Sequence, residues 1–222
     1  MKIWLSHVLS EDTPGYAGNQ GFWAEPDKQL CCGDSCNSTS IKMSNHIGSH
    51  VDAPLHFVAD GKATEAYSPD DWIFDKVVVF DVPMGLGEVL TSDKIAPLLG
   101  LMDDADLVLF KTGFGDMRAT DDYWGHPPAY APELAAFLKE KLPSIEAIGM
   151  DSISLSSLDH REMGREAHKE FLGRNIRIFE DLDFTKISAT TDIKQIIALP
   201  LRFENSDGAQ CTIMASLNDG EE

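Results

Sequence analysis

Residues 46–56 concentrate the side chains that bind divalent metal ions. His46, His50, Asp52 and His56 fall within these eleven residues, all at even positions, although the whole chain contains only seven histidines. Neutral imidazole beside a carboxylate is the donor set that zinc and manganese sites use. An ordinary half-exposed strand can also alternate in this way, but four such groups in one short segment favour a metal site.

The spacing of these residues predicts how they divide between metal ligands and a catalytic group. In an extended chain, residues two apart share a face and lie about 7 Å from each other, so His50 and Asp52 can converge on one ion. Gly48 permits backbone angles that bend the strand and bring His46 back into reach. The proline after Asp52 ends regular pairing and gives His56 a different orientation. The segment therefore predicts two or three ligands, followed by a histidine that stands off the ion as a candidate general base.

This segment resembles the signature of a known enzyme family. The cyclase family of metal-dependent hydrolases, which includes bacterial kynurenine formamidase and isatin hydrolase, has the pattern His-x-Gly-Thr/Ala-His-x-Asp-x-Pro-x-His. The chain departs from this pattern only at Ser49. Further similarities follow in family order at residues 12–19, 111–114, 149–154, 180–182 and 198–201. Together they extend the resemblance over most of the sequence.

The resemblance implies a role for each group in the segment. His46, His50 and Asp52 match the ligands of a first metal ion, and Asp52 is able to bridge to a second ion. His56 matches the catalytic acid/base. Tyr16, within the N-terminal similarity, matches an aromatic residue beside the substrate.

A second metal ion is implied by residues far along the chain. His168 and Glu180 are twelve residues apart, as in the two-metal formamidases, and match the ligands of that ion. His160 competes with His168 for this role, but its spacing to Glu180 fits less well. The formamidases continue Gly-x-Asp-x-x-Ser with Val-Asp, whereas this chain has Leu155 and Ser156. The lost carboxylate weakens the formamidase assignment relative to isatin-type ring opening and leaves the substrate open.

The resemblance also implies a fold and a reaction. The expected fold is α/β, the swivelling β/β/α cyclase-like fold with a mixed central sheet or barrel and flanking helices. The expected cofactor is Zn²⁺ or Mn²⁺, with one or two ions per subunit of a homodimer or larger homo-oligomer. A metal-activated water would cleave an amide, lactam or ester carbonyl of a small ring-bearing molecule, and the enzyme would act on C–N bonds other than peptide bonds.

A different class of function is a non-catalytic protein of the same fold that binds metal and serves as a ligand-binding or scaffold protein. A protein that only bound metal would not need a fourth imidazole beyond the ligands. His56 therefore favours the enzyme over this alternative.

Length and composition agree with one enzyme domain over residues 1–222. Hydrophobic residues make up 43% of the chain, enough to fill a substantial core. The 18 basic and 37 acidic residues give a formal charge of −19, which argues against nucleic acid and anionic membranes as partners. No apolar stretch reaches the length of a membrane span, and the first fifteen residues lack a signal-peptide pattern, so we expect a cytoplasmic protein.

Hydrophobic patterning predicts a mixture of strands and helices. Strands are expected at residues 2–8, 40–45, 77–82, 107–111, 147–149, 195–198 and 210–217, and helices at 92–99, 132–142 and 168–172. The polar segment 159–165 is expected to be a loop.

Two further segments allow more than one interpretation. Cys31 and Cys32 are adjacent and cannot easily share one tetrahedral metal site, so with Cys36 we expect them to be free thiols or a redox-labile pair. Residues 111–113 either position the substrate or form a simple turn at a strand end.

Overall fold

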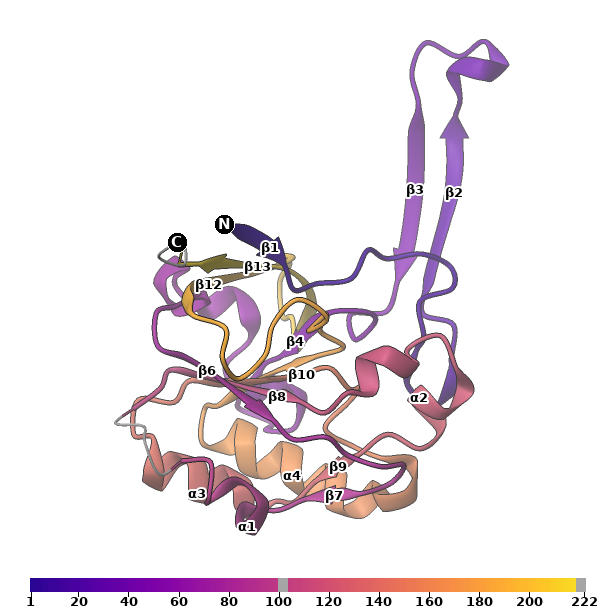
Figure 1. The fold of residues 1–222 in the computed structure, drawn as a ribbon. Helices are drawn as coiled ribbons and strands as arrows, with labels where there is room; N and C mark the ends of the chain where they lie inside the picture. The colour runs from indigo at the N-terminus through magenta and orange to yellow at the C-terminus, as the bar shows by residue number, and fades with distance from the viewer. Residues whose placement is uncertain (100–103, 219–222) are drawn as a thin grey trace.

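A curved mixed sheet forms the centre of the protein in the computed structural model, which describes residues 1–99 and 104–218 (Figure 1). Its strands run in the order β5 (Ile73–Phe74), β12 (Ile193–Pro200), β13 (Gly208–Leu217), β4 (His50–Asp52), β11 (Arg177–Glu180), β10 (Ala147–Met150), β8 (Leu107–Lys111) and β6 (Val77–Asp81), and β1 (Lys2–Trp4) pairs with β13. The sheet nearly closes, because β12 also contacts β6. The expected α/β fold with a mixed central sheet is confirmed.

Helices cover one face of this sheet because four of its strands are parallel. Strands β6, β8, β10 and β11 run in the same direction, so each connection between them must cross over the sheet. The crossovers contain α1 (Ser92–Ile95), α3 (Glu133–Lys141) and α4 (Arg161–Gly173), which lie together beneath the sheet in Figure 1. The smaller elements are α2 (Asp121–Gly125) and the parallel pair β7 (Val89–Leu90) and β9 (Ala129–Tyr130).

Two hydrophobic cores lie on opposite faces of the sheet. Successive side chains of a strand point to opposite faces, so Ile178 of β11 joins the core against the helices and Phe179 joins the other. On the helix side, Phe171 of α4 is fully buried. On the far side, Phe179 packs edge-to-face against Phe74. Burial on both faces explains why β6, β8 and β10 are mostly apolar in the sequence.

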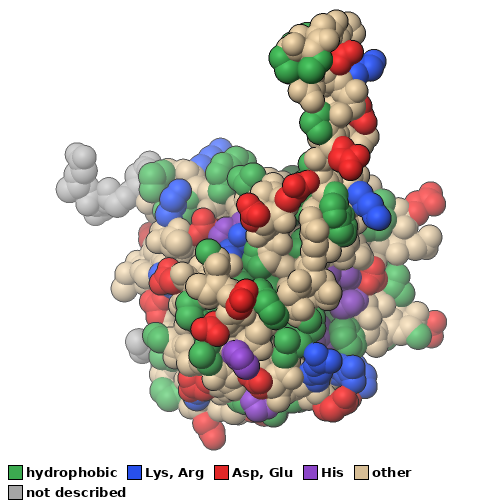
Figure 2. All heavy atoms as spheres, turned by 90° about the vertical axis from the view of Figure 1, so that its right-hand side faces the viewer, with side chains coloured by type: hydrophobic (Ala, Val, Ile, Leu, Met, Phe, Trp, Pro, Cys, Tyr) green, Lys and Arg blue, Asp and Glu red, His purple; other side chains and the backbone are tan. Residues whose placement is uncertain are grey.

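A two-stranded arm projects from this body (Figures 1 and 2). It consists of antiparallel strands β2 (Phe22–Lys28) and β3 (Ser38–Met43), joined by residues 29–37, which contain a 3-10 turn at Leu30–Cys32. The sequence predicted the strand around 40–45 but not β2, whose Pro26 and neighbouring acidic residues are poor strand formers. Pro26 is tolerated because each strand of a free ribbon has an open edge. The three cysteines near the tip, Cys31, Cys32 and Cys36, are exposed free thiols.

Several expected element boundaries were wrong, and three of the differences are large. The first strand ends at Trp4, and the helix expected at 92–99 is an α-helix of four residues, Ser92–Ile95. The loop expected at 159–165 is mostly helix, because α4 begins at Arg161. Its early turns are polar because they present charged residues to solvent, where pairs such as Arg165 with Glu162 support the helix. In the part of the chain that the structure describes, no helix is long and apolar enough for a membrane span.

Candidate active site

The His50–Asp52 strand lies at the centre of the sheet, between β11 and β13. Antiparallel pairing places His50 beside Glu180 on one side and beside Gln210 on the other. Gly48, just before the strand, has a φ of 64°, and a Cβ there would lie 2.4 Å from Leu9 Cδ2. Glycine adopts this left-handed conformation without strain and leaves room for Leu9, so the chain can turn here as the sequence predicted.

Two histidines and two carboxylates meet in a buried cluster. His50, Asp52, His168 and Glu180 are each at most 4% exposed. His50 Nε2 lies 3.4 Å from Asp52 Oδ1 and 3.4 Å from Glu180 Oε2. His168 Nε2 lies 3.5 Å from Asp52 Oδ2 and 3.4 Å from Glu180 Oε1.

These four separations are longer than charged hydrogen bonds, which span about 2.7–2.9 Å. They match the spacing of atoms around a shared ion. Ligands held at about 2.0–2.1 Å in a tetrahedron lie about 3.3 Å from one another. The residues present therefore fit a divalent metal ion.

Backbone carbonyls orient both imidazoles of the cluster. His50 Nδ1 lies 2.7 Å from Gly48 O, and His168 Nδ1 lies 2.8 Å from Gly164 O. A nitrogen that faces a carbonyl must carry a proton and donate it. Each ring is thereby turned so that Nε2 faces the carboxylates, which is the support that metal-binding histidines usually have.

The segment after β10 orients the Glu180 carboxylate. Glu180 Oε1 accepts hydrogen bonds from the backbone N–H of Leu155 at 2.7 Å and from Ser154 Oγ at 3.1 Å. The nearby Ser156 Oγ lies 3.4 Å from His168 Nδ1. The stretch that resembled the family motif thus holds a side chain of the cluster.

The charges of the cluster are strongly coupled. Burial alone would lower the pKa of His50 and of His168. The nearby carboxylates outweigh this effect, so the His50 pKa is raised well above its usual value and the His168 pKa is raised to about 10. Burial would raise the pKa of both acids, yet the histidines hold the Asp52 pKa well below its usual range and lower the Glu180 pKa to about 2. Without a metal ion, protons on the imidazoles balance the two carboxylates. A divalent cation would replace them.

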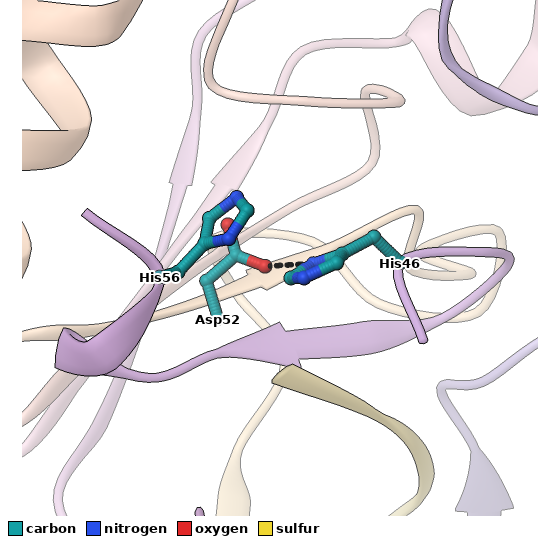
Figure 3. A group of neighbouring side chains, drawn as sticks. All are labelled: His46, Asp52 and His56. Carbon is teal, nitrogen blue, oxygen red and sulfur yellow. Dashed lines mark hydrogen bonds and ion pairs between the residues drawn. The ribbon is translucent and has the colours of Figure 1, made fainter. Parts of the chain in front are cut away.

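A second group of side chains adjoins the buried cluster through Asp52 (Figure 3). His46 Nδ1 lies 2.8 Å from Asp52 Oδ1, and the His46 and His56 rings stack with centroids 4.0 Å apart. Asp207 Oδ2 lies 2.9 Å from His46 Nε2 and 2.8 Å from His56 Nδ1. One carboxylate oxygen therefore links two histidines of the 46–56 segment.

Asp207 was missed by sequence reasoning. It lies in a polar segment between two strands, where an aspartate before glycine is typical of a turn. Only the pairing of Gly208 with Asp52 brings it to the site. A Cβ on Gly208 would lie 2.4 Å from His46 Cε1, so this close approach requires glycine. A glycine that directly follows an acidic residue was the only local signal.

Some residues singled out from the sequence lie outside the cluster. His160 Nε2 contacts Gly87 O at 2.9 Å, so the fold brings His168, and not His160, to Glu180. Thr112 and Gly113 bind the Asp151 carboxylate through Thr112 N at 2.8 Å, Thr112 Oγ1 at 2.6 Å and Gly113 N at 2.9 Å. These contacts tie the ends of β8 and β10 together.

Asp181, directly after Glu180, is held by a separate clamp. Arg118 donates from Nε to Asp181 Oδ1 and from Nη2 to Asp181 Oδ2, both at 2.7 Å, and the Tyr123 hydroxyl donates to Oδ1 at 2.5 Å. Asp181 has a φ of 54°, and its carbonyl accepts a hydrogen bond from Ser49 Oγ at 2.5 Å. The Ser49 hydrogen bond joins the start of β4 to the end of β11, and the clamp holds the Asp181 side chain beside it.

A cavity of about 420 Å³ opens over both groups. This volume lies within the range of small-molecule sites, about 300–1,000 Å³. Its lining includes all six predicted metal-site and catalytic residues, namely His46, His50, Asp52, His56, His168 and Glu180. Tyr16, the predicted substrate contact, also lines it, together with Phe57 and Ile153.

Comparison with known proteins supports one family. The Cyclase family model matches residues 3–157. The chain belongs to the cyclase family. Kynurenine formamidase of Salinibacter ruber is 30% identical over 207 residues, covering 92% of each protein, and that of Erythrobacter litoralis is 29% identical over 220 residues, covering 98% of this chain and 95% of the relative.

Solved structures of cyclase-family proteins show the same fold. Isatin hydrolase A from Labrenzia aggregata, bound to benzyl benzoate, superposes with a TM-score of 0.85 at 24% identity, covering 99% of this chain and 94% of that one. A potential metal-dependent hydrolase with cyclase activity gives 0.76 at 22% identity, covering 97% and 96%. The named relatives include hydrolases of carbon–nitrogen bonds outside peptides, so the expected enzyme class is confirmed.

Proposed function

We propose that this cyclase-family protein is a metal-dependent hydrolase of small ring-bearing molecules. It cleaves an amide, lactam or ester carbonyl, and N-formylarylamines and isatin-like lactams are the leading substrates. The observation that carries this proposal is the buried cluster that lines the cavity. The Nε2 atoms of His50 and His168 each lie 3.4–3.5 Å from two carboxylate oxygens, one of Asp52 and one of Glu180.

The cluster offers two adjacent positions for Zn²⁺ or Mn²⁺. His50 shares one with Asp52 Oδ1 and Glu180 Oε2, and His168 shares the other with Asp52 Oδ2 and Glu180 Oε1. His46 is the proposed further ligand of the first set: its Nδ1 is hydrogen-bonded to Asp52 Oδ1 at 2.8 Å, and this contact would give way to the ion. When bound, a divalent ion lowers the pKa of a water molecule and polarises a carbonyl group.

His56 is the proposed acid/base. Its Nδ1 donates a hydrogen bond to Asp207 Oδ2, which leaves Nε2 as the nitrogen that can accept a proton. The His56 and His168 ring centroids are 6.2 Å apart, so His56 lies next to the metal positions without belonging to the buried quartet. It can take a proton from the attacking water and return it to the departing nitrogen or oxygen.

The aromatic wall of the cavity orients the substrate ring. Tyr16 is half-buried, and burial raises its pKa, so its hydroxyl stays protonated at neutral pH and can donate a hydrogen bond. Phe57 stacks on His168 with ring centroids 4.7 Å apart and shields that imidazole from water. The flat aryl ring of the substrate can lie between Tyr16 and Phe57, with the substrate carbonyl group directed toward the proposed metal site.

The proposal predicts a separation between metal binding and turnover. Protein loaded with Zn²⁺ or Mn²⁺ is assayed on N-formylarylamines, isatins and lactones, with metal content measured by mass spectrometry. His56→Ala should lower turnover at least about a hundredfold with metal content intact, because general acid–base catalysis contributes about 10²–10⁴-fold. His126→Ala, an exposed histidine paired with Asp159, is the matched control and should retain activity.

Loss of metal together with activity in His56→Ala would show that His56 is a ligand instead. Metal-loaded protein without turnover on the whole panel would favour a binding or scaffold role.

A homodimer or larger homo-oligomer is part of the same proposal. The projecting arm exposes apolar side chains, with Leu30 57% and Ile41 59% accessible, and a second copy of the chain that packed against the arm would cover them. Light scattering at several protein concentrations tests this, and a monomer at all concentrations would contradict it.

A further inference from the structure

One stripe of α4 connects the buried cluster to the open part of the cavity. Arg161, Arg165 and His168 are separated by four and three residues, so they lie on the same face of the helix. All three line the cavity. At about 1.5 Å of rise per residue, Arg165 stands about 4.5 Å and Arg161 about 10.5 Å along the helix axis from His168. The helix therefore places one guanidinium group nearer to the proposed reaction centre and a second one farther from it.

Most other charges around the cavity are already compensated. Asp181 is neutralised by its bidentate contact with Arg118, and a divalent ion would balance Asp52 and Glu180. Position 156, which also lines the cavity, holds a neutral serine. The metal-loaded cavity thus carries an excess of positive charge near Arg161 and Arg165, in a protein with a net charge of −19.

Both arginines line the cavity, and among the described residues no ion pair with a buried carboxylate neutralises either of them. The ion pair of Arg165 is with Glu162 at 2.6 Å, and the Glu162 side chain is 83% exposed, so solvent screens this contact. Both arginines act on the half-buried Tyr16 hydroxyl and lower its pKa, against the rise that burial causes. The arginines and Tyr16 therefore surround one region of the cavity. Figure 2 shows, on the face drawn, acidic side chains widely scattered and basic ones in few places.

We propose that Arg161 and Arg165 form a subsite for a carboxylate on the substrate. This inference rests on the proposed hydrolase function, because the reaction centre fixes where the rest of the substrate lies. A guanidinium group binds a carboxylate through two parallel N–H donors, which gives direction as well as charge. The substrate is then an anionic aryl amide or lactam, whose carboxylate tail extends along α4 while its scissile carbonyl lies at the Asp52 and Glu180 carboxylates.

A pair of probe molecules tests the subsite. One is an N-formylaniline whose ring carries a short alkyl chain that ends in a carboxylate, and the other has a primary amide in place of the carboxylate. The ratio of kcat/KM, carboxylate over amide, should be at least about tenfold in the unmodified protein, since a hydrogen bond to a charged group contributes about 1.5–3 kcal/mol. The double variant Arg161→Gln/Arg165→Gln should reduce this ratio to near one, mainly through KM for the carboxylate.

The matched control removes two positive charges from the same region outside the cavity. Lys169 and Arg174 pair with Glu166 and Glu170 and do not line the active-site cavity. Lys169→Gln/Arg174→Gln should keep the preference for the carboxylate. If the control lowers the ratio as much as the arginine variant does, the effect is long-range electrostatics and the subsite is refuted.

Binding of the two aniline products, measured by calorimetry on metal-loaded protein, separates this inference from the proposed function. Tighter binding of the carboxylate product that depends on Arg161 and Arg165, without turnover of either formanilide, would support the subsite and contradict formamidase activity. Turnover of both formanilides at equal efficiency would support the hydrolase and overturn the subsite. Equal binding of both products overturns the subsite in every case.

Discussion

Replacing Asp207 with asparagine should disable His56 while preserving the shape of the site. In the native protein, Asp207 Oδ2 faces His46 Nε2 and His56 Nδ1, and Oδ1 accepts a bond from Asn45 Nδ2 at 2.6 Å. An amide has one oxygen and one NH₂ group, so it cannot satisfy all three donors. The substitution therefore changes the hydrogen bonding of His56 without removing any atom of the side chain.

Either orientation of the new amide is unfavourable. With the NH₂ toward the histidines, His56 Nδ1 must accept, its proton moves to Nε2, and the ring can no longer act as a base through that nitrogen. With the oxygen toward the histidines, the NH₂ faces Asn45 Nδ2, and an unmet hydrogen bond costs about 1–3 kcal/mol. In this orientation the neutral amide also no longer stabilises the imidazolium that forms when His56 accepts a proton. We expect kcat to fall at least about a hundredfold, equivalent to about 2.7 kcal/mol of transition-state stabilisation.

The assay measures kcat and metal content together, at saturating metal, on the best substrate of the panel. Glu204→Gln is the control, because it removes one negative charge from an exposed position near the same turn. Its kcat should stay close to that of the unmodified protein. A kcat of Asp207→Asn within about threefold of the unmodified protein, with metal bound, would refute the role that we give to Asp207.

Two further predictions concern metal uptake and stability. The pKa of both His50 and His168 is raised in the metal-free protein, so metal binding at pH 7 should release about two protons and should weaken as the pH falls. Calorimetry in buffers of different ionisation enthalpy measures the number of protons released. Release of no protons would contradict the proton balance of the buried cluster. Arg118→Leu should destabilise the fold by about 3–5 kcal/mol in urea unfolding, because it leaves the buried Asp181 carboxylate without its cation. Arg174→Leu, which breaks an exposed pair, should cost less than about 1 kcal/mol, and equal losses in the two variants would contradict the clamp.

Local spacing predicted much of the site, because the groups from His46 to His56 are positioned by the nearby backbone. The even spacing places His50 and Asp52 on one face of a strand, and Gly48 and Pro54 shape its two ends. These effects act within a few residues, so the sequence shows them directly.

Other parts of the site depend on contacts that no local pattern contains. Asp207 reaches His46 across 161 residues of sequence, through a pairing of β13 with β4 that the apolar runs do not specify. The helical start of α4 was missed because its first turns are polar, and charged residues there serve the surface and the cavity. Strand β2 was missed because its acidic residues and Pro26 are unfavourable in a sheet but tolerated in a free ribbon.

The central place of β4 has a consequence for the order in which the protein becomes competent. The His50–Asp52 strand leaves the ribosome early, but its two neighbours are β11 and β13, which are synthesised more than a hundred residues later. Contacts so distant in sequence form slowly, because the intervening chain must first be ordered. A nascent chain that stops before Gly208 holds its histidines without the strand that fixes them. Under the proposed function, metal binding would therefore require the completed sheet, and a partly made chain would lack the hydrolytic site.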